Sequence, residues 1–141
     1  MITYQTEGAR MPDIKKRMLT AWIKKVATEY GKKVGEVAYI FCNDEKILEV
    51  NREYLQHDYY TDIITFDYTE KERISGDIFI SLDTVKSNAE KFEQPYEREL
   101  HRVIIHGILH LCGISDKEPG EREIMEAAEE KALKHLNNIE A

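Results

Sequence analysis

The sequence is organised around one stretch, His106-Gly107-Ile108-Leu109-His110-Leu111-Cys112-Gly113-Ile114-Ser115-Asp116. His106 and His110 are four residues apart, so on a helix they project from one face. Two imidazoles placed in this way can share one divalent metal ion. Gly113 is expected to end the helix, because glycine adopts the left-handed conformation that closes helices. The chain can then turn back and offer Asp116 as a third ligand. The alternative is a pair of histidines that are packed or hydrogen-bonded in a core helix.

The same stretch resembles the signature of the YbeY family of rRNA maturation endoribonucleases, which reads roughly His-Gly-x-Leu-His-Leu-x-Gly-Tyr-Asp-His. The matching residues are His106, Gly107, Leu109, His110, Leu111 and Gly113. The third histidine of the family falls on Asp116, and a carboxylate can replace an imidazole as a zinc ligand. The resemblance therefore implies one zinc ion per chain, bound by His106, His110 and Asp116. Nickel or iron would also suit such ligands.

A second stretch resembles the family pattern Asn-x-x-Tyr-Arg-x-Lys-Asp-x-Pro-Thr-Asp-Val-Leu-Ser-Phe. The matching residues are Asn51, Tyr54, Asp58, Thr61, Asp62 and Phe66, with close substitutes at Ile63, Ile64 and Thr65. The arginine of the family, thought to act on the substrate, falls on Leu55. We expect Arg52, Asp62 and Thr65 to face the substrate. A solvated helix for Arg52 and strand-edge hydrogen bonding for the other two are the alternatives.

A third stretch, Gly76-Asp77-Ile78-Phe79-Ile80-Ser81, is similar to the family segment Gly-Asp-Ile-x-Ile-Ser. An ordinary core strand entered through a glycine turn explains it equally well.

His57 lies where the family has a basic residue, in a loop, and loops often carry function. His101 and His135 have no partner at ligand spacing and are expected on the surface. Cys112, two residues after His110, is expected to point away from the metal.

Length and composition indicate one globular domain, residues 1–141. Hydrophobic residues make up 42% of the chain and charged residues 33%, and no apolar run approaches the roughly 20 residues that span a bilayer. The sequence begins without the basic and apolar segments of a signal peptide. Cys42 and Cys112 are far apart and form no C-x-x-C motif, which favours free thiols in a reducing compartment. We therefore expect a cytoplasmic location.

Charge is distributed unevenly along the chain. The net charge is −7, which argues against strong nonspecific binding to nucleic acid. Between positions 10 and 33, however, eight basic residues stand against two acidic ones, a local charge of +6. The eight are Arg10, Lys15, Lys16, Arg17, Lys24, Lys25, Lys32 and Lys33. Residues 117–141 carry four basic and seven acidic side chains, a local charge of −3. The basic segment is thus the better surface for phosphate, with a solvated helix face as the alternative.

The hydrophobic pattern predicts an α+β fold, a small mixed four-stranded sheet packed with about five helices. Strands are expected at 37–42, 61–68 and 76–81. Helices are expected from Pro12 to Gly31, from an N-cap at Asp44 through Tyr54, from an N-cap at Asp83 to Phe92, from Pro95 through the histidine pair, and from Pro119 onward. The first should bury Ile14, Met18, Trp22, Val26 and Tyr30, and the last Ile124, Ala128, Ala132 and Leu136. The histidine helix should line a cleft beside strand 61–68.

The function implied by the resemblance is a metal-dependent endoribonuclease specific for single strands. It would act in maturation of the 16S rRNA 3′ end and in ribosome quality control. Its partners would be single-stranded rRNA and the ribosomal subunit, with ribosomal proteins or a GTPase as further candidates and no membrane. One alternative is a ribosome-assembly binding protein whose metal is structural, which would require a fourth protein ligand. A metallopeptidase is disfavoured, because Gly107 stands where the His-Glu-x-x-His motif has its glutamate.

Overall fold

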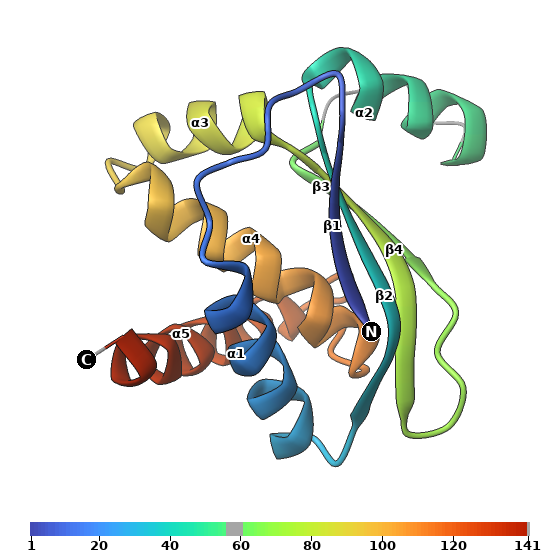
Figure 1. The fold of residues 1–141 in the computed structure, drawn as a ribbon, viewed down its shortest axis with the longest axis vertical. Coiled ribbons are helices and arrows are strands. Elements are labelled where there is room, and N and C mark those ends of the chain that lie inside the picture. Colours follow the sequence, from blue (N-terminus) through green and yellow to red (C-terminus); the bar gives the residue numbers. More distant parts are fainter. Residues whose placement is uncertain (56–60, 141) are drawn as a thin grey trace.

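The computed structural model describes residues 1–55 and 61–140. Over these residues the chain forms five α-helices, one π-helical turn and a four-stranded sheet (Figure 1). The order is β1 (Ile2–Glu7), α1 (Lys16–Glu29), β2 (Lys33–Cys42), α2 (Asp44–Val50), the π-helical turn Asn51–Leu55, β3 (Ile63–Asp67), β4 (Arg73–Ser81), α3 (Leu82–Lys91), α4 (Tyr96–Leu111) and α5 (Glu121–Glu140). The predicted α+β class is confirmed.

The sheet is mixed and has the strand order β1-β2-β4-β3. β1 pairs with β2 and β2 with β4 in parallel, whereas β3 pairs with β4 in antiparallel orientation. In Figure 1 the helices α1, α3, α4 and α5 lie on one side of the sheet, and α2 lies at its upper end. Thr65 lies opposite Ile78 in the β3–β4 register. Because alternate residues of a strand share a face, Ile63 and Thr65 are on the side that α4 covers.

Helix α4 is the central element of the hydrophobic core. It begins after Pro95, with Glu97 and Glu99 in the first turn. Negative side chains at this end of a helix interact favourably with the helix dipole. Its end is a Schellman motif, as the sequence predicted for Gly113. The Gly113 N–H donates to the His110 carbonyl and the Ile114 N–H to the Leu109 carbonyl, at 3.0 and 3.1 Å, and Gly113 has a φ of +101°. This reversal turns the chain back toward the helix.

Several element boundaries differ from the predictions. The first helix begins at Lys16 rather than Pro12. The N-caps of α2 and α3 are Asn43 and Ser81, not Asp44 and Asp83, because the former side chains accept the N–H of residues three further on. Strand β1 was not predicted, since four of its six residues are polar and give no clear hydrophobic signal. Within the described part of the chain, no helix has the length and apolar character needed to cross a membrane.

Two predictions of burial were wrong. On α5, the predicted Ala132 and Leu136 are buried, but Ile124 is 61% exposed whereas its neighbour Met125 is 2% exposed, so only the first turn differs from the predicted face. His101 was expected on the surface but is buried, with its ring edge-on to Trp22 at a centroid distance of 6.1 Å. His101 therefore belongs to the core between α1 and α4. Both cysteines are free thiols, Cys42 buried and Cys112 half-buried, as the sequence predicted.

Candidate active site

A pocket of about 410 Å³ opens between α4, strand β3 and the loop that follows α4. Five of the six residues that the sequence singled out line it, namely Asp62, Thr65, His106, His110 and Asp116. Asp62 and Thr65 lie just before and within β3, about forty residues before His106, His110 and Asp116 in α4 and the loop after it, and the fold brings the two segments together. The pocket also corresponds to the predicted cleft beside the strand that begins near Thr61.

The polar wall of the pocket is one face of α4. Arg102, His106 and His110 follow one another at intervals of four residues and all line the pocket. The adjacent side of the helix lies directly against the sheet at Gly107. A Cβ atom at that position would lie 2.9 Å from Ile78 Cδ1 and 3.3 Å from Ile63 Cδ1. Glycine thus allows the close approach that sets the two histidines beside β3.

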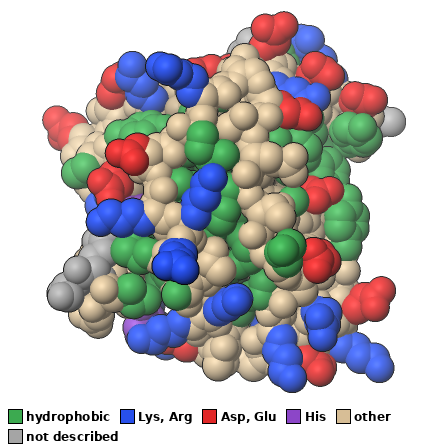
Figure 2. All heavy atoms as spheres, viewed as in Figure 1, with side chains coloured by type: hydrophobic (Ala, Val, Ile, Leu, Met, Phe, Trp, Pro, Cys, Tyr) green, Lys and Arg blue, Asp and Glu red, His purple; other side chains and the backbone are tan. Residues whose placement is uncertain are grey.

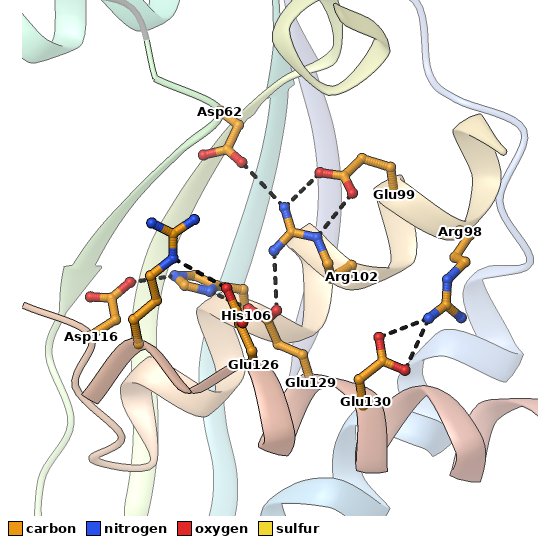
Figure 3. A network of polar contacts seen from close by, with 10 residues as sticks. Asp62, Arg98, Glu99, Arg102, His106, Asp116, Glu126, Glu129 and Glu130 are labelled. Carbon is orange, nitrogen blue, oxygen red and sulfur yellow. Dashed lines mark hydrogen bonds and ion pairs between the residues drawn. The ribbon is translucent and has the colours of Figure 1, made fainter. Parts of the chain in front are cut away.

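A carboxylate network holds the inner half of this wall (Figure 3). Glu129 of α5 accepts hydrogen bonds from His106 Nδ1 at 2.6 Å and from Arg102 Nη1 at 3.1 Å, one on each oxygen. Glu99 accepts two more from Arg102, at 2.9 and 2.6 Å, and Asp62 lies 3.7 Å from the same guanidinium. Glu99 and Glu129 are each only 3% exposed. Their negative charges are therefore compensated by paired and hydrogen-bonded partners.

The network fixes the imidazole of His106. An ionised Glu129 can only accept, so Nδ1 carries the hydrogen and Nε2 is left toward the pocket. Burial lowers the pKa of His106, but the hydrogen bond and charge of Glu129, aided by Asp116 and Asp62, outweigh it and raise the pKa above its usual value. Burial also raises the pKa of Asp62, against the opposing charge of Arg102.

The three predicted metal ligands, His106, His110 and Asp116, lie in the same pocket. Asp116 Oδ2 lies 3.4 Å from His106 Nε2, and His110 lines the same pocket one helical turn further along. A histidine whose second nitrogen donates to a carboxylate is typical of metal ligands, and His106 with Glu129 has this arrangement. As the side chains lie, however, no group of three His, Cys, Asp or Glu residues within 1–55 and 61–140 is arranged to hold a metal ion. The chemistry of the donors fits zinc, and the three-ligand set stays a prediction.

Comparison with known proteins gives the family. The family model for endoribonuclease YbeY matches residues 2–137. The chain belongs to the YbeY family.

Its relatives within the YbeY family include an endoribonuclease YbeY of Phocaeicola vulgatus, 81% identical over 94% of this chain and 96% of the relative. One from Bacteroides fragilis is 77% identical over 94% of this chain and 95% of the relative. Among solved structures, a Thermotoga maritima protein studied in solution aligns with a TM-score of 0.67 and 28% identity, over 96% of this chain and 89% of that one. Membership of the YbeY family supports an endoribonuclease role.

The structure does not bring the sixth predicted residue, Arg52, to the pocket. Arg52 lines a separate depression with Glu45, Leu48, Glu49 and Glu53, whereas Leu55, at the YbeY family's arginine position, lines the pocket itself. The placement of Arg52 therefore does not support the expectation that it faces the substrate in this pocket. His57 and Asp58, which the sequence also marked, lie outside the described residues.

Three residues of the site were missed by the sequence reasoning. Arg102 continues the spacing of His106 and His110 one turn toward the N-terminus of α4, so the same periodicity could have found it. Lys117 follows Asp116 directly and also lines the pocket. Glu129 had no local signal, because it is 23 residues from its partner His106 and only the packing of α5 on α4 joins them.

Proposed function

We propose that this chain is a metal-dependent endoribonuclease that cleaves single-stranded RNA in maturation of the 16S rRNA 3′ end and in ribosome quality control. The observation that carries the proposal is one pocket in which His106, oriented by the buried Glu129, faces Asp116 beside His110 in a member of the YbeY family. Work on ribosomal RNA implies a cytoplasmic location, with ribosomal proteins or a GTPase as candidate partners.

His106, His110 and Asp116 would hold one zinc ion per chain. Bound there, zinc would supply Lewis-acid chemistry toward a phosphate oxygen of the RNA. The chain's own residues prepare this site. Glu129 accepts the hydrogen of His106 Nδ1, Arg102 donates to Glu129 and holds it in place, and Asp62 and Thr65 line the same pocket.

The basic segment at positions 10–33 supports RNA as the substrate class. Lys15, Lys16, Arg17, Lys24 and Lys25 are all exposed on or beside α1. Figure 2 shows several Lys and Arg side chains over the lower half of the molecule, where α1 lies in Figure 1. Such a surface attracts the RNA backbone through counterion release. We propose that it contributes affinity without sequence preference.

The two alternative functions make different demands on the site. A metallopeptidase of the His-Glu-x-x-His type needs a glutamate next to the first histidine. Position 107 is instead a glycine against the sheet, where a Cβ atom would lie 2.9 Å from Ile78 Cδ1 and any side chain would have to displace Ile78. A binding protein with a structural metal needs a fourth ligand. It would keep its metal and its partner but would leave RNA intact.

The test combines metal analysis with RNA cleavage. Purified protein should contain about one zinc per chain and should cleave a single-stranded RNA oligonucleotide but not the same sequence in a duplex. Chelation should abolish cleavage, and added zinc should restore it. Stoichiometric metal with no cleavage of RNA would favour the binding protein, and cleavage that survives complete metal removal would contradict the metal-dependent mechanism.

A further inference from the structure

The pocket must accept a polyanion, yet two of its lining side chains, Asp62 and Asp116, are carboxylates. A phosphate group that enters therefore needs a positive partner supplied by the chain. Two of the residues described around the pocket carry a permanent positive charge, Arg102 and Lys117. The question is which of them is available to the substrate.

Arg102 is committed to the protein. Its Nε and Nη2 atoms donate to Glu99, its Nη1 atom donates to Glu129, and Asp62 lies 3.7 Å from Nη2 (Figure 3). Three carboxylates around one guanidinium leave a local negative excess. A phosphate that approached Arg102 would meet this excess and would compete with hydrogen bonds that already exist.

Lys117 is free in all these respects. Its side chain is exposed, and among the residues that the structure describes it forms neither an ion pair nor a hydrogen bond. The neighbouring carboxylate of Asp116 is directed to His106 Nε2, at 3.4 Å. Across the pocket, Leu55 is 41% exposed and contributes no charge.

The backbone that carries Lys117 is fixed at both ends of its loop. The Schellman motif at Gly113 holds the start. At the other end, the Glu118 N–H donates to the Glu121 carboxylate at 2.7 Å, and the Glu121 N–H donates to the Glu118 carbonyl at 3.0 Å. The fixed loop gives the Lys117 backbone a defined position, and the flexible side chain lets its ammonium group adjust to the position of a bound phosphate.

We propose that Lys117 is the substrate-binding cation of this pocket and contacts a phosphate of the RNA next to the bond that is cleaved. This assignment rests on the proposed function. It divides the two cations of the site: Arg102 holds the carboxylate network, and Lys117 binds the substrate.

The test compares Lys117→Gln with Lys117→Arg and with a matched control, Lys134→Gln. Lys134 is exposed on α5 and does not line the pocket. Lys117→Gln should lower kcat/KM for a single-stranded oligonucleotide about tenfold, as expected for the loss of one charge-assisted hydrogen bond. The plot of log kcat/KM against log salt should become shallower by about 0.7. Lys117→Arg should restore most of the loss, and Lys134→Gln should stay within about twofold of the unmodified protein.

Equal values for Lys117→Gln and Lys134→Gln would overturn the assignment, as would a Lys117→Arg variant no better than Lys117→Gln. Failure of the proposed function would look different, because the unmodified protein itself would then not cleave RNA. In that case binding of the same oligonucleotide, followed by fluorescence anisotropy, still decides whether Lys117 contributes more than Lys134.

Discussion

The two halves of the pocket wall differ in how many of their polar side chains form hydrogen bonds or ion pairs within the protein. The inner half is the carboxylate network of Glu99, Arg102, Glu129 and the Nδ1 side of His106, in which every charged group has a partner within 3.1 Å. The outer half, which we call the open rim, comprises His110, Asp116 and Lys117. Within the described chain, His110 and Lys117 have no side-chain hydrogen bond or ion pair, and Asp116 lies 3.4 Å from His106.

This difference indicates which half serves the fold and which serves ligands. Buried charges that lose a partner are costly, so the carboxylate network should contribute strongly to stability. Partly exposed side chains without partners add little stability, but they can bind a metal ion or a phosphate without breaking existing bonds. Changes in the network should therefore lower the stability of the protein strongly, whereas changes in the open rim should mainly affect binding.

The largest effect is expected for Glu129→Ala. It leaves both His106 and Arg102 without the carboxylate that joins them, so the free energy of unfolding should fall by about 3 to 5 kcal/mol. Urea unfolding measures this, with Glu130→Ala as the matched control. Glu130 is next in the chain but forms an exposed pair with Arg98, and its loss should cost less than about 1 kcal/mol. Similar losses in the two variants would remove the distinction between the network and the surface.

His110→Ala tests the open rim. Stoichiometric zinc should be lost, a larger effect than the roughly 10- to 100-fold loss of affinity typical when an outer partner of a ligand is removed. The unfolding free energy of the metal-free protein should change by about 1 kcal/mol or less. Metal analysis and unfolding of the same preparations measure both. Full zinc occupancy in this variant would show that His110 is not a ligand.

Asp116 should have a smaller effect on metal binding, because two imidazoles would remain. Asp116→Ala should weaken zinc binding, since only two protein ligands would remain. Asp116→His should keep the metal. The pH at which activity rises should be lower in this variant, because a neutral imidazole would leave more positive charge on the zinc than a carboxylate does. Titration with a zinc indicator and a pH–rate profile measure the two. Unchanged affinity in Asp116→Ala would show that another residue closes the site, with Glu118 examined first.

The smallest effect concerns Asp62, whose pKa is raised by burial. A carboxyl group with a raised folded pKa binds protons more tightly in the native state, so its ionisation destabilises the fold as pH rises. Asp62→Asn should therefore stabilise the protein near pH 7 by no more than about 1 kcal/mol. The gain should vanish at pH values below 3.8, the usual pKa of the group. Unfolding at several pH values checks this, and a gain that grows toward acid would contradict the burial argument.

Local patterns in the sequence predicted the fold class, and together with the family resemblance they identified five of the residues that line the pocket. The spacing of His106 and His110, the glycine stop at Gly113 and the position of Asp116 are short-range features, and backbone geometry alone makes them neighbours. Asp62 and Thr65 were expected from the resemblance to the family pattern, and only the packing of β3 beside α4 brings them to the histidines. Element ends were less accurate, because Asn43 and Ser81 compete with adjacent aspartates as caps and only the final backbone conformation selects between them.

By itself, the amino-acid sequence determined that one helix carries a histidine pair, ends at a glycine and returns a carboxylate to the same side. Only the tertiary structure decided which side chains complete the site. Arg52 is close to the family's arginine position in the chain but faces a different depression, whereas Glu129 is far along the chain and bonds directly to His106. The physical reason is that helical periodicity fixes neighbours within a few residues, while contacts between α4, α5 and β3 depend on how the hydrophobic faces of all three pack.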